Sequence, residues 1–373
     1  DGWGRDATYV VFDASNWGGA HSHLARNSVQ IFAHGRALLP DTGTLTYAMD
    51  NKGNEGDAFD NRIGPYGKST PAHNTLNLNG WNQAPTNPDF LRVFDSDDCA
   101  AVVSQYSGGY WPGSYGWWFR EGFGAGVHAE HERIMIWVKS RYVVTIDRMM
   151  RWDEQALGGS DQQNPALEMN WQLTPGGDVD VRPDHTGFSA VYPEGGLLAL
   201  LPKPAAEMKL AVREGETDPF RGWITTRRKA RADLRRAGVF DGPPLDDWVD
   251  RTYGPAPQIC GTATPMAGFG ESIVTVFVPF AGATPPAVEA AVSGTIADEF
   301  PQRTDGRLCL QWGDGSRELL AWSASLDQPL YRVADGDDTF GTDGCVLHVV
   351  RDVDGEVVRQ HALDATYTQP DNG

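Results

Sequence analysis

The stretch HAEHERIMIWVKSRYVVTIDRM, residues 128–149, decides the fold class of this chain. Apolar and polar residues alternate on both sides of Lys139-Ser140-Arg141, and a period of two is typical of a half-buried β-strand. Two such runs around a short polar turn predict an antiparallel hairpin. The first expectation is therefore an antiparallel β-sheet.

The same pattern recurs along the rest of the sequence. The segment SVQIFAHGRALLPDTG, residues 28–43, predicts a second hairpin with its turn at His34-Gly35. The chain holds 43 glycines and 24 prolines, which suit many short strands joined by tight turns, and its 40% hydrophobic residues are enough for a sizeable core. Further strands are expected at LEMNWQLTP, GFSAVYP, GLLALLP and SIVTVFVPF.

We therefore expect an all-β protein with two parts. A large antiparallel β-sandwich is expected over residues 1–284 and a smaller β-rich region over residues 285–373, and the stretch at 283–294, ATPPAVEAAVSG, resembles a linker. One short helix is expected near residues 227–238, where a basic run ends on a glycine. Residues 48–70 are polar and glycine-rich, which predicts a long loop, and loops of that length are usually functional or disordered.

The charge and hydropathy of the chain argue against two classes of protein. A net charge of −19 argues against a nucleic-acid-binding protein, because such proteins need a basic surface against phosphate. This charge also repels polyanionic substrates at long range, although a local basic or metal-bearing site overcomes the repulsion within about one Debye length, roughly 8–10 Å. The sequence has no run of about eighteen apolar residues, so no membrane-spanning helix is expected.

The four cysteines, Cys99, Cys260, Cys309 and Cys345, are far apart and form no C-x-x-C pair. This spacing excludes a cysteine zinc ribbon. It leaves two alternatives, which are buried thiols or at most two disulfides.

Two histidines, His21 and His23, stand one residue apart in the segment NWGGAHSHLARNS. In a β-strand they would point to the same face. Two imidazoles and a carboxylate form a standard zinc ligand set. His23, Asp41 and His73 would form such a set if the ends of three neighbouring strands converge.

Spacing alone does not bring Asp41 to His23. A simple hairpin about His34-Gly35 places Asp41 opposite Ser28, and five residues of strand separate Ser28 from His23 by about 16 Å. The chain must therefore bend or bulge before Ser28 if Asp41 is to reach the histidine.

Three blocks of the sequence follow one another in a specific order. They are GGAHSHLARNSVQIFAHGRALLPDTGTLTY at 18–47, KSTPAHNTLNLNG at 68–80 and HERIMIWVKSRYVVTIDRM at 131–149. Together they resemble the β-domain of the heparinase II/III-like polysaccharide lyases, a superfamily that includes heparinases and exolytic oligoalginate lyases. The motifs that carry the resemblance are H-x-H, an Asp before a glycine at the end of a hairpin, an H-N pair, and a hairpin that begins H-E-R and ends in Asp.

This resemblance implies an architecture and a metal site. Members carry an N-terminal (α/α) toroid followed by an antiparallel β-sheet domain, with the active site between them. By the matching motifs, His23, Asp41 and His73 are implied to hold a structural zinc ion, and His21 to lie at the active site. The toroid is absent from this chain, which opens at Asp1 almost directly on a strand-like run. We therefore expect the chain to start partway through a longer gene product and to associate with a toroid segment of that product.

The implied reaction is β-elimination on a uronic-acid polymer. Abstraction of the C5 proton of a uronate builds dianion-like charge on its carboxylate, which hydrogen-bond donors stabilise. His21 is expected to neutralise the carboxylate or act as the base, and Tyr66 to donate a proton to the leaving oxygen. Arg62 and Asn74 are expected to hold the carboxylate.

The leading hypothesis is thus the zinc-bearing β-domain of a polysaccharide lyase. Its substrate would be an acidic polysaccharide or oligosaccharide, alginate-like or glycosaminoglycan-like, and its location secreted or periplasmic, because large polysaccharides do not cross membranes. Two alternatives stay open. One is a non-catalytic carbohydrate-binding or interaction β-sandwich with a structural zinc, and the other is a zinc hydrolase whose metal leaves one position for water.

Overall fold

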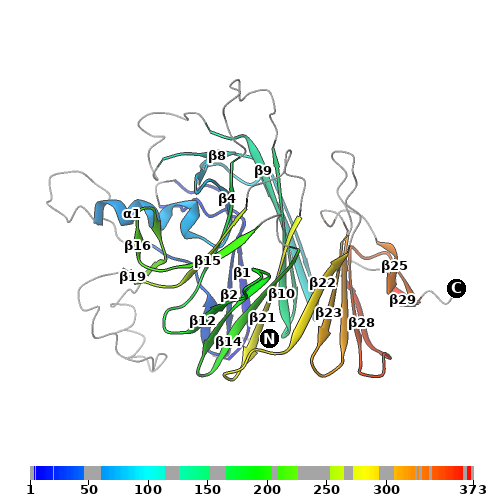
Figure 1. The fold of residues 1–373 in the computed structure, drawn as a ribbon. Coiled ribbons are helices and arrows are strands. Elements are labelled where there is room, and N and C mark those ends of the chain that lie inside the picture. Colours follow the sequence, from blue (N-terminus) through cyan, green and yellow to red (C-terminus); the bar gives the residue numbers. More distant parts are fainter. Residues whose placement is uncertain are drawn as a thin grey trace.

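The protein is described here from a computed structural model of residues 1–373. The structure describes residues 4, 6–19, 21–45, 60–113, 126–151, 165–203, 208–225, 253–263, 272–293, 306–323, 326, 330–335, 338–363 and 368–370. These residues form antiparallel β-sheets stacked face to face, with little helix (Figure 1). The all-β antiparallel sandwich expected from the sequence is confirmed.

An eight-stranded sheet forms the centre of the molecule. The hairpin expected at 128–149 lies in the middle of this sheet, and Ser140 takes a left-handed conformation (φ 64°) in its turn. In spatial order the strands are β12 (Asp178–Val181), β13 (Gly187–Tyr192), β14 (Gly195–Lys203), β21 (Ser272–Ala281), β10 (Tyr142–Arg151), β9 (Ala129–Val138), β7 (Cys99–Tyr106) and β6 (Phe90–Asp95).

Two smaller sheets cover one face of the central sheet. One contains β1 (Tyr9–Asp13), β2 (Ser28–Ala33) and β3 (Arg36–Leu39), and the other β15 (Lys209–Arg213), β20 (Gln258–Ala263), β11 (Leu167–Gln172) and β4 (Leu76–Leu78). The turn between β2 and β3 lies at His34 and Gly35, as expected, and both have positive φ. Ile31 and Trp171 from these sheets share an apolar core with Phe277 of the central sheet.

A C-terminal sheet covers the opposite face (Figure 1). Its strands are β22 (Val288–Ser293), β23 (Gly306–Trp312), β24 (Arg317–Trp322), β27 (Val346–Arg351) and β28 (Val357–Leu363). Leu308 and Leu320 of this sheet pack against Ile136 and Val276 of the central sheet in a second core. A third layer packs on the outside of the C-terminal sheet and consists of β25 (Tyr331–Asp335), β26 (Asp338–Thr342) and β29 (Thr368–Pro370).

The prediction of a linker at 283–294 is wrong over much of that stretch, because strand β22 occupies Val288–Ser293. Val288 and Val292 point inward and pack on the second core, so this short alternating run is a strand despite the two prolines that precede it. The five-stranded sheet thus begins just after residue 284. The division at that residue stays a prediction.

The loop expected at 48–70 contains a helix, α1 (Asp60–Lys68), so the loop prediction is wrong there. Ile63 and Tyr66 lie three residues apart on this helix and pack with Trp223 in a small apolar cluster. This tertiary contact outweighs the poor helix propensity of the glycines and proline in the segment. The helix expected near 227–238 lies outside the described residues. The remaining short elements are η1 (Thr70–Ala72), β5 (Asn82–Gln83) with β8 (Tyr110–Trp111), β16 (Glu216–Thr217) with β17 (Phe220–Arg221), and β18 (Trp223–Thr225) with β19 (Tyr253–Pro255).

All four cysteines are free thiols, and three of them are buried. Of the two alternatives from the sequence, the structure shows the buried thiols. In the described segments, no helix is both long and apolar enough to span a membrane.

Candidate metal centre

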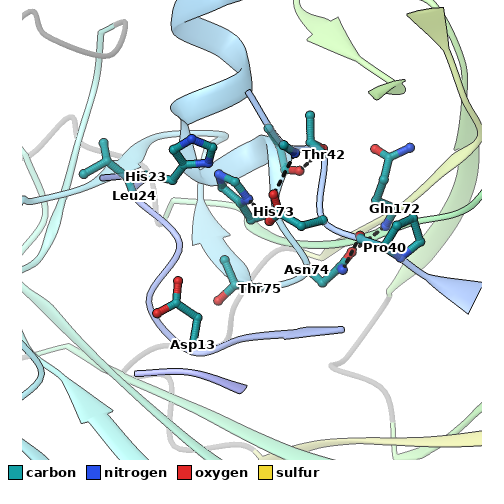
Figure 2. A network of polar contacts seen from close by, with 12 residues as sticks. Asp13, His23, Leu24, Pro40, Thr42, His73, Asn74, Thr75 and Gln172 are labelled. Carbon is teal, nitrogen blue, oxygen red and sulfur yellow. Dashed lines mark hydrogen bonds and ion pairs between the residues drawn. The ribbon is translucent and has the colours of Figure 1, made fainter. Parts of the chain in front are cut away.

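His23, Asp41 and His73 converge as the sequence predicted. One potential ligand atom from each residue lies within 4.8 Å of the others. The rings of His23 and His73 lie side by side with their centroids 5.1 Å apart (Figure 2). His73 Nδ1 lies 2.6 Å from Asp41 Oδ2, and the other oxygen of Asp41 accepts a hydrogen bond of 2.7 Å from the backbone N–H of Gly43.

The bend that brings Asp41 to His23 lies at Asn27. This residue has a φ of 62°, a left-handed conformation that asparagine tolerates better than most residues. Its backbone N–H donates to the carbonyl of Asp13 at 2.8 Å, and the N–H of Ser28 donates to the carbonyl of Ala25 at 3.0 Å. The chain therefore turns immediately before β2, where the hairpin geometry required it.

His21 and His23 do not lie in a β-strand, so the expectation that they share one strand face is wrong. The described residues from 21 to 27 form turns, bends and irregular backbone. His21 is exposed and His23 is partly buried. The structure therefore places one imidazole toward solvent and the other in the metal centre.

The electrostatics of the centre suit a metal ligand set. Burial lowers the pKa of His23 to about 4, and the neighbouring His73 acts in the same direction. Burial disfavours the ionised form of Asp41, but the electrostatic interaction with His73 and the hydrogen bond between the two side chains prevail and hold the pKa of this carboxyl below its usual value. At neutral pH the centre thus offers a neutral imidazole on His23 and a carboxylate on Asp41.

One buried atom marks the centre as a place for a cation. His73 Nε2 is buried and has no hydrogen-bond partner within the described part of the chain. Buried polar atoms are nearly always satisfied, so such an atom calls for an explanation. Two imidazoles and a carboxylate form a zinc ligand set. The residues present therefore fit a zinc ion.

Asn74 is buried and its side chain is fully engaged with the backbone. Its Nδ2 donates to the carbonyls of Val29 and Pro40, both at 2.8 Å, and its Oδ1 accepts from the N–H of Gln172 at 2.6 Å (Figure 2). Pro40 directly precedes Asp41. Asn74 therefore supports the backbone next to the metal centre. Its expected contact with a substrate carboxylate stays a prediction, and this geometry does not favour it.

Tyr66 is only 6% exposed and packs in the apolar cluster beside Phe220, with ring centroids 5.9 Å apart. Its hydroxyl donates to Oε1 of Gln258 at a long 3.4 Å. Burial holds the pKa of Tyr66 well above its usual value. A proton-donating role for Tyr66 is therefore still a prediction, and its position is that of a packing residue.

Arg62 lies in α1, but its side chain is outside the described residues. Sequence reasoning missed two residues near His23. Thr44 Oγ1 lies 3.4 Å from His23 Nε2, and the buried Lys68 contributes to the low pKa of His23. Both fall within the sequence blocks that carried the family resemblance, so a closer look at the polar residues of these blocks would have found them.

Comparisons with known proteins support the same family. Two curated relatives match, both described as heparin-sulfate lyase. The protein from Bacteroides stercoris is 23% identical over 198 residues, which cover 53% of this chain and 24% of the relative. The protein from Pedobacter heparinus is 23% identical over 172 residues, which cover 46% of this chain and 21% of the relative. The matched region thus spans about a quarter or less of these relatives.

Solved structures agree on the fold. A heparan sulfate lyase, HepC, from Pedobacter heparinus superimposes with a TM-score of 0.59 at 17% identity, covering 86% of this chain and 40% of that one. A heparinase III gives a TM-score of 0.57 at 14% identity, covering 87% and 40%. The sequence model of the family described as heparinase II/III-like, C-terminal, matches residues 2–238. Since this match spans more than half of the chain, the protein belongs to the heparinase II/III-like C-terminal family.

Proposed function

We propose that this chain is the β-domain of a polysaccharide lyase that cleaves a uronic-acid-containing polysaccharide by β-elimination. The observation that carries the proposal is the convergence of His23, Asp41 and His73 beside the exposed His21. Family membership supports a lyase. The heparin-sulfate lyases among the relatives favour a glycosaminoglycan-like substrate over an alginate-like one.

A zinc ion held by His23, Asp41 and His73 would cross-link the irregular segment at 21–27 to the end of β3. His21 is two residues from this anchor, so its exposed imidazole would be held in a fixed position. In its neutral form His21 would take the C5 proton of the uronate, and in its charged form it would donate a hydrogen bond to the uronate carboxylate. Both roles need the ring to be accessible.

The proposal extends to partners and location. We infer that the chain acts together with an (α/α) toroid segment, because its matches span only a minor part of the curated relatives. We also infer a secreted or periplasmic location, since the proposed substrate is a polymer that does not cross membranes. Immunoblotting of the culture medium, the periplasmic fraction and the cytoplasmic fraction would test that location, and protein found only in the cytoplasmic fraction would refute it.

The reaction is tested on the full-length protein. Heparan sulfate, heparin, hyaluronan and alginate are incubated with it, and the ultraviolet absorbance of a 4,5-unsaturated uronate is followed. His21→Ala is expected to lower the rate about 100-fold or more, the range for a general acid or base. His34→Asn is the matched control, because His34 lies at the tip of the β2–β3 hairpin in a left-handed conformation (φ 52°) that asparagine tolerates. An unsaturated product formed equally by wild type and His21→Ala would refute the role of His21.

One observation favours the non-catalytic alternative. Tyr66 and Asn74 are both buried, which leaves His21 as the exposed residue among the catalytic and substrate-binding candidates whose side chains are described. A carbohydrate-binding domain would retain the polymer on an affinity gel and form no double bond. Products that are cut but saturated would instead favour a zinc hydrolase.

A further inference from the structure

The hairpin that decides the fold carries a buried charged cluster. His131 and Arg133 lie two residues apart on β9 and face the same side, and Asp147 on β10 is the direct partner of Arg133 in the strand register. Asp147 Oδ1 accepts hydrogen bonds from His131 Nε2 at 2.7 Å and from Arg133 Nε at 2.6 Å. Each of the three residues is at most 1% exposed.

Stability alone is a weak explanation for this cluster. Taking charges out of water costs several kcal/mol per ion, and well-packed apolar residues often serve a core equally well or better. Met135 and Met149, on the same face of the same two strands, belong to the apolar core. The charged groups therefore call for another explanation, and the hydrogen bonds of Arg133 supply one.

The guanidinium of Arg133 extends from the sheet to the metal centre. Its Nη1 donates to the carbonyl of Asn27 at 2.5 Å and to the carbonyl of Asn74 at 2.8 Å. Asn27 forms the bend that follows His23, and Asn74 is bonded directly to His73. One side chain thus ties both histidine-bearing segments to the central sheet.

The neighbours of Arg133 reinforce this connection. The side-chain Nδ2 of Asn27 donates back to the carbonyl of His131 at 3.0 Å, so the bend is attached to β9 from both sides. Burial opposes ionisation of Asp147, but the charge of Arg133 and the hydrogen bond from His131 hold its pKa below the usual value. Asp147 is therefore an anion at neutral pH and fixes the guanidinium plane.

We propose that Arg133, oriented by Asp147 and His131, is the positioning residue of the candidate metal centre. By fixing the carbonyls of Asn27 and Asn74, it sets the separation of the imidazoles of His23 and His73. The inference rests on the metal-binding part of the proposed function. It does not give Arg133 any contact with substrate.

The test uses the full-length protein and the variant Arg133→Lys. Lysine keeps the charge beside Asp147, but a single ammonium cannot replace the guanidinium, which bonds the carboxylate and two carbonyls at once. Zinc affinity, measured by competition with a chromophoric chelator, is expected to fall about 10- to 100-fold, as for other residues that orient metal ligands. The absorption spectrum of the cobalt-substituted protein is expected to change as well, because it reports ligand geometry.

Arg351→Lys is the matched control. Arg351 is also buried and pairs with Asp335 and Asp338 at 2.7 and 2.6 Å, and it donates to the carbonyl of Gly355 at 2.9 Å. None of these contacts involves the metal centre. The control is expected to lose stability but to keep the zinc affinity and cobalt spectrum of the wild type. A folded Arg133→Lys protein with wild-type affinity and spectrum would overturn the proposal.

Two further measurements keep the proposal testable if Arg133→Lys does not fold or if the wild type binds no zinc. Should Arg133→Lys not fold, Asp147→Asn removes the anion that orients the guanidinium and is expected to weaken zinc binding in the same way. Should the wild type bind no zinc, the metal-binding proposal fails, and imidazole NMR then tests the positioning. Shifted His23 and His73 resonances in Arg133→Lys but not in Arg351→Lys would support a positioning role, and unchanged resonances would refute it.

Discussion

Replacing Asn74 by alanine decides whether this residue supports the metal centre or contacts substrate. The side chain is 2% exposed and makes three hydrogen bonds, to the carbonyls of Val29 and Pro40 and from the N–H of Gln172. Alanine removes all three and leaves three backbone groups in buried residues without this partner. At about 1–3 kcal/mol for each buried group that loses its partner, we expect a loss of about 3 kcal/mol or more in the free energy of unfolding.

Urea unfolding of the zinc-free protein measures this loss. Asn87→Ala is the control, because Asn87 is exposed and accepts one hydrogen bond, from the N–H of Trp17 at 2.8 Å, so it should change the free energy by about 1 kcal/mol or less. Asn74→Ala should also bind zinc more weakly, since the Pro40 carbonyl next to Asp41 is released. Unchanged stability together with a raised KM at saturating zinc would refute this reasoning and restore the substrate contact implied by the family resemblance.

Three further predictions concern single side chains. His23→Ala should abolish zinc binding in elemental analysis of the purified protein, whereas His34→Asn should keep about one zinc per chain. Equal zinc content in the two variants would contradict the assignment of His23 as a ligand. Tyr66→Phe should lose about 1 kcal/mol or less in urea unfolding and keep the wild-type cleavage rate, because its hydrogen bond is long; a rate reduced about 100-fold would instead identify it as the proton donor. Burial holds the pKa of His131 below its usual value despite the opposing hydrogen bond to Asp147. As the pH falls, the unfolded chain therefore takes up this proton before the folded protein does, and the free energy of unfolding should fall as the pH drops below about 6.5. His131→Gln should reduce this slope in urea unfolding at pH 7 and pH 5, and an unchanged slope would show that other groups cause it.

Most of the sheet architecture was predictable because alternation of apolar and polar residues is a local signal. The two hairpins around Ser140 and His34 follow directly from it. Helix α1 was not predictable, because its glycines and proline disfavour a helix and its apolar face is covered by Trp223, which lies far away in sequence. Strand β22 was missed because the prolines just before it favoured a linker over a strand of alternating alanine and valine.

The metal centre was predictable in its residue types but not in its geometry. A straight hairpin would leave Asp41 about 16 Å from His23. In the structure, a left-handed turn at Asn27 bends the chain so that the two residues meet. No glycine or proline marks this turn in the sequence. The direction of a polar side chain is equally hidden, since the motif that contains Asn74 reads the same whether the amide faces substrate or backbone.

The positions of the ligands explain why buried polar groups gather behind them. His23 lies in an irregular segment outside the strands of the described residues, so its backbone is not held by the ladder of hydrogen bonds that fixes a residue in a sheet. Buried carbonyls of such a segment still need donors. Arg133 supplies them to Asn27 and Asn74, and Asn74 in turn supplies them to Val29 and Pro40. The side chain of Arg133 thus links the central sheet to these loops, alongside the backbone hydrogen bonds from Asn27 to Asp13 of β1 and from Val29 of β2 to Asn74. For this reason, we expect a substitution at the strand residue Arg133 to weaken metal binding, although Arg133 lies outside the loops that carry the ligands.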